Sequence, residues 1–329
     1  MWQPAGSVSV MATAPARVAV GPEAVQVGAE DDYGPSGRSE WLDIDWREHQ
    51  RWVHVRGRAV NVIELGEGPP LLFVHGHSGR WANWLENIPH LAGTRRVVAL
   101  DLPGFGASEM PADGVSIANY ARALDEVCGL LDIDAAAVVG NSLGGFVSAE
   151  LAIKFPQRVE RLGLVSAAGL STKYVGLSSE FFRRRSVGMF ARAINAYAAI
   201  PEARAQTLVR RRRLRRRVLE VVAAHPERLS APICAELLQG SGKPAAPDAT
   251  DAIMTYDFRD RVTEIACPTL IVWGDKDRVV PVKSAHEYER LIPDTRKEIF
   301  ADTGHVPMVE RPARFNRVLQ EFLEEGPAS

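Results

Sequence analysis

Short apolar runs alternate with segments long enough to form helices, and no other feature of this chain restricts its fold as strongly. The runs cover residues 71–74, 97–100, 136–139, 162–166 and 269–273, and a strand-like segment of mixed polarity, Lys-Glu-Ile-Phe, follows at 297–300. Runs of this length are typical of strands buried on both faces, and parallel strands need a connection long enough to hold a helix. The sequence therefore predicts an α/β fold with a mostly parallel sheet flanked by helices.

The rhythm of strand and helix is interrupted once, which indicates an insertion. Residues 169–262 are helical in composition, contain five prolines and have no strand-like run, so we expect a helical cap there. The core then consists of residues 39–168 and 263–329. In the first part of the core, residues 52–65 alternate between apolar and polar around a glycine-containing turn, which predicts a β-hairpin. We expect this hairpin at the edge of the sheet. An amphipathic helix over 312–323 closes the core.

The N-terminal residues 1–38 are rich in Ala, Val, Gly, Pro and Ser and show little periodicity, so we expect a disordered leader. Either Met1 or Met11 could be the start of translation. No stretch reaches the roughly 20 apolar residues of a membrane span, and no cationic region precedes an apolar core as in a signal peptide. The three cysteines lie far apart, without disulfide or metal-ligand spacing. These features predict a cytoplasmic protein without an integral membrane segment; the oligomeric state is left open.

One basic segment stands out from a chain whose net charge is only −2. Seven arginines lie within 210–217, and three more occupy 183–185. Seven arginines in eight positions cannot share one helix face, so a solvated basic helix is the simplest interpretation. Attraction of an anionic substrate or of an acidic membrane surface is the alternative. Binding of nucleic acid is not expected, because no motif that reads nucleic acid accompanies the arginines.

A serine lies at the centre of a glycine-rich turn after the third apolar run. Residues 138–145 read Val-Val-Gly-Asn-Ser-Leu-Gly-Gly, and a helix-like segment follows. Glycines two residues before and after Ser142 remove side chains that would collide in a strained strand-turn-helix connection. Such a turn exposes the Ser142 hydroxyl at the sheet edge, although a plain glycine-rich turn has the same composition.

Other chemically reactive side chains also follow strands. His75-Gly76 follows the first run, Asp275 and Asp277 follow the fifth, and His305 follows the strand-like segment at 297–300. Ligands of open α/β sheets bind beyond the carboxyl ends of the strands, where all these residues are expected. The chain order serine, acid, histidine is that of the α/β-hydrolase triad.

With these motifs in place, residues 53–323 resemble the α/β-hydrolase fold superfamily, in its branch with a serine nucleophile. The resemblance depends on five motifs in the same order: His75-Gly76, residues 101–108 (Asp-Leu-Pro-Gly-Phe-Gly-Ala-Ser), the turn at 140–144, residues 274–277 with Val280-Pro281, and residues 304–307 (Gly-His-Val-Pro).

The resemblance implies a catalytic triad. A serine hydroxyl needs a base to remove its proton, and an imidazole needs a carboxylate to fix its tautomer. Ser142 is the implied nucleophile and His305 the implied base. Family members with Gly-x-x-Asp before a hydrophobic pair and proline use the fourth residue, which selects Asp277; Asp275 stays the alternative. Asp302 is expected to form a turn.

The resemblance also implies an oxyanion hole, formed by the backbone N–H groups of His77 and Leu143. It predicts a serine hydrolase that cleaves carboxylic esters or related small acyl substrates through an acyl-enzyme, with neither cofactor nor metal. The Gly-Asn-Ser elbow is also similar to that of meta-cleavage product hydrolases, which cut carbon–carbon bonds, but Val306 stands where they often have tryptophan. A ligand receptor without catalysis is a third hypothesis.

Overall fold

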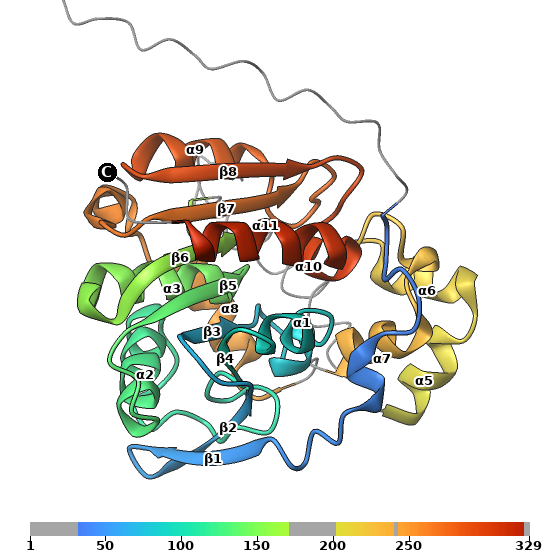
Figure 1. The fold of residues 1–329 in the computed structure, drawn as a ribbon, viewed down its shortest axis with the longest axis horizontal. Coiled ribbons are helices and arrows are strands. Elements are labelled where there is room, and N and C mark those ends of the chain that lie inside the picture. The colour runs from blue at the N-terminus through green and yellow to red at the C-terminus, as the bar shows by residue number, and fades with distance from the viewer. Residues whose placement is uncertain (1–31, 171–201, 240–242, 326–329) are drawn as a thin grey trace, which may run out of the picture. The chain divides into compact units, whose positions relative to one another are not determined.

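The computed structural model describes residues 32–170, 202–239 and 243–325. Within them an eight-stranded sheet runs from β8 at the top of Figure 1 to β1 at the bottom. The strands are β1 (Gln50–Val55), β2 (Arg58–Leu65), β3 (Pro70–Val74), β4 (Arg96–Leu100), β5 (Ala136–Asn141), β6 (Val159–Val165), β7 (Thr269–Gly274) and β8 (Thr295–Phe300).

The order of the strands is β1-β2-β4-β3-β5-β6-β7-β8. From β4 to β8 all neighbours are parallel, whereas β2 pairs antiparallel with both β1 and β4. The expected hairpin thus lies at the sheet edge, and the predicted α/β fold with a mostly parallel sheet is confirmed. Because the parallel strands all point the same way, their carboxyl ends meet along one edge.

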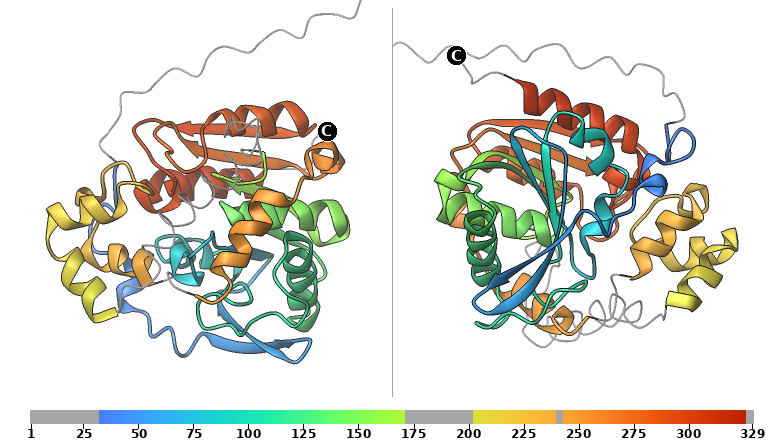
Figure 2. Two further views of the ribbon diagram at one scale, coloured as in Figure 1. Left: turned by 180° about the vertical axis from the view of Figure 1, so that it is seen from behind. Right: turned by 60° about the horizontal axis from the view of Figure 1, so that its bottom comes forward.

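Each central strand divides its side chains between two apolar layers, as the two-residue period of a strand requires. In β3, Leu72 and Val74 belong to one buried cluster, and Leu71 and Phe73 belong to the other. The first cluster includes side chains of α2 and α3, and the second includes side chains of α1 and α11. Helices therefore cover both faces of the sheet, as Figures 1 and 2 show.

The core helices are α1 (Ile88–Ala92), α2 (Ile117–Leu130), α3 (Leu143–Lys154), α9 (Lys283–Leu291), α10 (Pro307–Glu310) and α11 (Pro312–Glu324). Short 3-10 helices are found at Glu40–Asp43, Trp81–Trp84, Pro156–Arg158, Pro226–Arg228 and Arg259–Glu264. The amphipathic helix expected near the C-terminus is α11, whose Phe315 and Leu319 are fully buried.

The region expected as a cap contains α5 (Glu202–Val209), α6 (Arg212–Leu219), α7 (Ala231–Gln239) and α8 (Ala246–Thr255). We use the word cap below as a name for the described residues within 202–255 alone. No strand occurs between β6 and β7 in the described residues. Helices α5 and α6 lie farther from the sheet than α7 (Figures 1 and 2). The arginines at 183–185 lie outside the described residues.

The segment expected as a disordered leader is described only from residue 32 onward. There Tyr33 is buried, and its hydroxyl donates a hydrogen bond of 2.7 Å to the Glu310 carboxylate. Residues 32–38 therefore pack onto the core through at least one specific contact.

Candidate active site

Ser142 occupies a sharp turn between β5 and α3. Its backbone has φ 55° and ψ −116°, a conformation that residues other than glycine rarely adopt. The flanking glycines are required by space: a Cβ on Gly140 would lie 2.3 Å from the Gly144 carbonyl oxygen, and one on Gly144 would lie 2.2 Å from that of Val74. The glycine spacing seen in the sequence thus permits the close packing that holds Ser142 in its strained turn.

His305 lies in the loop after β8, and its ring contacts one carboxylate. The distance from His305 Nδ1 to Asp277 Oδ2 is 2.8 Å, and the Asp277 side chain is fully buried. The other carboxylate oxygen of Asp277 accepts hydrogen bonds from the N–H groups of Val279 (2.8 Å) and Val280 (2.9 Å). With its carboxylate fixed in this way, Asp277 favours the tautomer that leaves His305 Nε2 free to accept a proton.

The two other aspartates considered from the sequence lie elsewhere. Asp275 is exposed, and its carboxylate accepts a 3.3 Å hydrogen bond from the N–H of Thr303. Asp302 forms a turn with φ 51° and lies 2.7 Å from the ring of His225. Of the three, only Asp277 contacts the His305 ring in the described structure.

Ser142 and His305 line the same cavity, which together with its open mouth encloses about 860 Å³ of empty space. Both residues are largely buried, with 8% and 5% of their surface exposed. No hydrogen bond joins the Ser142 hydroxyl to the His305 ring among the interactions of the described residues. Contacts of this kind often form only when substrate is bound.

The cavity is mostly aliphatic. Five valines and three leucines line it, together with the turn from Gly76 to Gly79, Asn83 and Asn141. The valines include Val218 and Val222, which belong to the cap, and Val306, which follows His305. No lysine or arginine is among the lining residues that the structure describes. The aliphatic part of this lining therefore suits an apolar group.

The turn after β3 places His77 at the cavity. The N–H groups of His77 and of Leu143, the first residue of α3, form no hydrogen bond with any described residue. Leu143 has none because a helix leaves its first N–H groups unsatisfied. His75 is fully buried, accepts a 2.9 Å hydrogen bond from the N–H of Leu102, and has a pKa lowered by burial. A neutral His75 thus connects the turn to the end of β4.

Contacts that the sequence did not reveal hold the backbone of His305. The N–H of His305 donates to the Val222 carbonyl (2.9 Å), and the Asn141 side chain donates to the His305 carbonyl (3.2 Å). The buried carboxylate of Glu310 accepts from the N–H of Gly304 at 2.9 Å. A lone acid within the apolar run 306–310 was the one sequence signal for this role.

Two further side chains of the turn after β3 contact the cap. His77 Nε2 lies 2.8 Å from the carbonyl oxygen of Ala246 in α8, and burial lowers the His77 pKa. Arg80 forms an ion pair with Glu236 of α7 and a 2.8 Å hydrogen bond to Gln239. The cap is thereby tied to the turn at two points.

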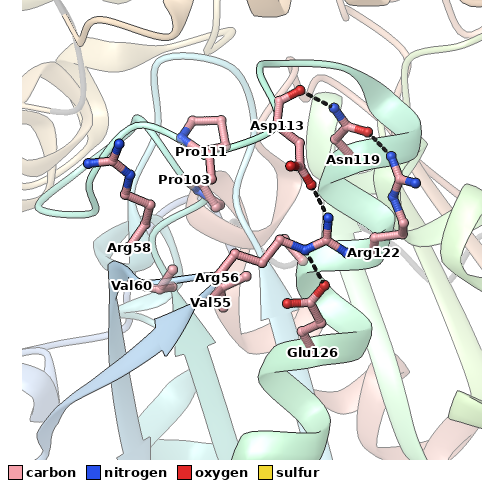
Figure 3. Close-up of a pocket in the computed structure, with 12 residues that line it drawn as sticks. Val55, Arg56, Arg58, Val60, Pro103, Pro111, Asp113, Asn119, Arg122 and Glu126 are labelled. Carbon is pink, nitrogen blue, oxygen red and sulfur yellow. Dashed lines mark hydrogen bonds and ion pairs between the residues drawn. The ribbon is translucent and has the colours of Figure 1, made fainter.

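A second hollow lies apart from this cavity, between the β1–β2 hairpin and α2 (Figure 3). Together with its open mouth it encloses about 350 Å³ of empty space. Arg56 crosses it to form ion pairs with Asp113 and with Glu126, the latter at 2.7 Å (Figure 3). Its lining holds no serine, cysteine or histidine, so it offers no nucleophile and no base of the kind that the larger cavity has.

The described residues hold no group of three or more His, Cys, Asp or Glu side chains arranged for a metal ion. Cys128, Cys234 and Cys267 are free thiols, and burial raises the pKa of each. A raised pKa keeps a thiol protonated and unreactive at neutral pH. No described helix has the length and apolar character needed to cross a bilayer.

The family model for the alpha/beta hydrolase fold matches residues 69–312, and the chain belongs to this family. An uncharacterized protein of Mycobacterium tuberculosis (strain H37Rv) is 32% identical over 284 residues, which cover 83% of this chain and 80% of that protein. A 2-hydroxymuconate semialdehyde hydrolase of Pseudomonas sp. (strain CF600) is 29% identical, covering 85% and 95%. The crystal structure of a membrane phospholipase A is similar with a TM-score of 0.65 and 28% identity, covering 84% and 85%.

Proposed function

We propose that this protein is a serine hydrolase that cleaves carboxylic esters or related acyl compounds through an acyl-enzyme. One observation carries the proposal: the strained Ser142 lines the same cavity as His305, and the His305 ring is hydrogen-bonded to the buried carboxylate of Asp277. A nucleophile, a base and a group that orients the base are the parts that this chemistry requires.

In the proposed reaction, Ser142 Oγ attacks the acyl carbon while His305 Nε2 takes the hydroxyl proton. The Asp277 carboxylate stabilises the resulting imidazolium through Nδ1–H. The free N–H groups of His77 and Leu143 would receive the oxyanion. His305 then gives its proton to the leaving alcohol, and a water activated by His305 releases the acid from Ser142.

Replacement of the nucleophile and of the orienting carboxylate tests this proposal. In an assay with p-nitrophenyl esters, Ser142→Ala should reduce kcat to background without changing the far-UV circular dichroism. Asp277→Asn should reduce kcat by about 10⁴-fold, because the base then holds the wrong tautomer. Asp275→Asn is the matched control, in the same loop, and should retain activity. Full activity of the Ser142 variant would refute the mechanism.

Cleavage of a carbon–carbon bond is the second candidate, since the similarity to the 2-hydroxymuconate semialdehyde hydrolase favours it. A muconate-type substrate carries a carboxylate, whereas the described cavity lining offers no lysine or arginine. The lining therefore favours a neutral acyl group. Parallel kinetics with esters, lactones and a vinylogous diketone distinguish the two: a much larger kcat/KM for the diketone would select the carbon–carbon hydrolase.

A pure ligand receptor is the third hypothesis, and covalent labelling tests it. A fluorophosphonate should label Ser142 in the wild-type protein and not in Ser142→Ala. The reagent reacts with a serine only when a neighbouring base activates it. An unlabelled wild-type protein would favour the receptor.

A further inference from the structure

Helix α6 carries a dense, exposed positive charge. Arg213, Arg216 and Arg217 are exposed, and their spacing of three and four residues places them on one side of the helix. Arg210 and Arg211, directly before the helix, are exposed as well. None of these five side chains has a hydrogen bond or an ion pair within the part of the chain that the structure describes. We call these five residues the arginine face.

The opposite side of α6 faces inward. Arg215 and Leu219 are buried, and the Arg215 guanidinium donates a 2.7 Å hydrogen bond to the Leu229 carbonyl. Val218, Leu219 and Val222 line the cavity that contains Ser142. One helix thus presents arginines to solvent and aliphatic side chains to the cavity. The outer position of α6 on the cap is seen in Figures 1 and 2.

The form of the arginine face indicates an extended anionic partner. None of its residues lines either cavity described above, so the arginines do not surround a site for one small anion. Stacking of nucleic-acid bases needs aromatic side chains, and residues 202–222 contain none. Clusters of four to eight basic residues on an amphipathic helix are typical of binding to anionic lipid headgroups. The aliphatic cavity beneath α6 is compatible with the acyl chains of such lipids.

We propose that the arginine face binds the anionic headgroup surface of a lipid membrane. The attraction is electrostatic, because exposed charges of opposite sign meet across water and headgroups, so it weakens as salt shortens the Debye length. Binding on this side brings the cavity close to the lipid surface. Membrane binding of this kind does not require catalytic turnover. It can therefore be tested separately from the proposed ester hydrolysis.

Co-sedimentation of the full chain with vesicles tests the proposal. The wild-type protein should bind equimolar phosphatidylcholine and phosphatidylglycerol vesicles and should not bind pure phosphatidylcholine vesicles. The triple variant Arg213→Gln, Arg216→Gln, Arg217→Gln should bind the mixed vesicles at least about tenfold more weakly, since each basic residue near the surface adds to the attraction. Its activity toward a water-soluble ester should equal that of the wild type.

A matched control removes the same charge elsewhere. Arg58, Arg122 and Arg317 are exposed on the core, and the first two border the second hollow (Figure 3). Their simultaneous replacement by glutamine should leave vesicle binding within about twofold of the wild type, because they lie outside the arginine face.

Three results would overturn the proposal. They are an equal loss of vesicle binding in the two triple variants, equal binding of the wild type to mixed and to pure phosphatidylcholine vesicles, or no binding of the wild type to the mixed vesicles. A single-stranded RNA that binds the wild type, combined with no binding to mixed vesicles, would assign the arginine face to nucleic acid instead. Ser142→Ala should bind the mixed vesicles as the wild type does. This keeps a failure of membrane binding distinguishable from a failure of the proposed catalysis.

Discussion

At the scale of single residues, His77 connects the cavity to the cap through its side chain. The Ser78 hydroxyl lies 2.9 Å from His77 Nδ1, and Nε2 lies 2.8 Å from the Ala246 carbonyl and 3.0 Å from the Thr250 hydroxyl. A carbonyl only accepts, so Nε2 carries the proton and Nδ1 accepts from Ser78. The lowered pKa that burial gives His77 agrees with this neutral form.

Substitution of His77 should therefore affect the proposed oxyanion hole through the position of its backbone. His77→Phe keeps a ring but removes the Nε2–H that donates to Ala246, whose carbonyl keeps the 3.0 Å hydrogen bond from the Thr250 hydroxyl. The turn then loses this contact with α8 and can shift. We expect kcat for esters to fall by about tenfold or more with little change in KM, because a displaced oxyanion donor affects mainly the transition state. His77→Gln, whose amide nitrogen can take the place of Nε2, should recover most of the loss.

A kcat of wild-type size in His77→Phe would contradict the predicted positioning role. A rise in KM alone would instead indicate that the ring contacts substrate. Thermal unfolding of both variants gives the control for a general loss of stability.

At the scale of elements, the C-terminal residue of α10 joins three separate segments. The Glu310 carboxylate accepts hydrogen bonds from the N–H of Gly304 (2.9 Å), the N–H of Ala224 (2.8 Å) and the hydroxyl of Tyr33 (2.7 Å). These donors belong to the His305 loop, the cap and the N-terminal segment. Burial raises the Glu310 pKa, whereas the donors favour the ionised form.

Glu310→Gln should weaken the contact with the His305 loop. The amide oxygen can replace Oε2, which accepts from all three donors, but the amide nitrogen then faces the N–H groups of Gly304 and Val306 that donate to Oε1. A buried donor left without an acceptor costs about 1–3 kcal/mol. We expect a decrease of that size in the free energy of unfolding measured with urea, together with a lower kcat. Glu324→Gln, an exposed residue of α11, is the control and should change neither value. Unchanged stability of Glu310→Gln would show that the carboxylate is not needed as an acceptor.

Elements of the core could be predicted from the sequence because their signals are local. The apolar runs identify strands, and the glycines around Ser142 identify the turn, since both depend on neighbouring residues alone. The contacts of His77 with Ala246 and of Glu310 with Tyr33 join residues 169 and 277 positions apart. Such contacts depend on where the cap and the N-terminal segment pack, and no periodicity within either segment encodes that position.

At the scale of the whole molecule, the fully buried His75 and the half-buried His77 make stability depend on pH. Burial lowers the pKa of His75 and of His77 in the folded state. In the unfolded chain a histidine titrates near pH ~6.5. Below that pH the unfolded state binds more protons than the folded state, so the free energy of unfolding decreases as the pH falls toward the folded pKa values. Above pH ~6.5 both states are neutral at these residues, and their contribution stays constant.

Urea denaturation at about pH 7.5 and about pH 5.5 measures this effect. The wild-type protein should lose stability between the two conditions, and His77→Gln should lose less, because glutamine keeps the hydrogen bond to Ala246 but takes up no proton. Glu310 is present in both proteins, so its own titration cancels in the comparison. An equal loss in both proteins would contradict the role of His77, and the acid sensitivity would then belong to His75 or to other groups.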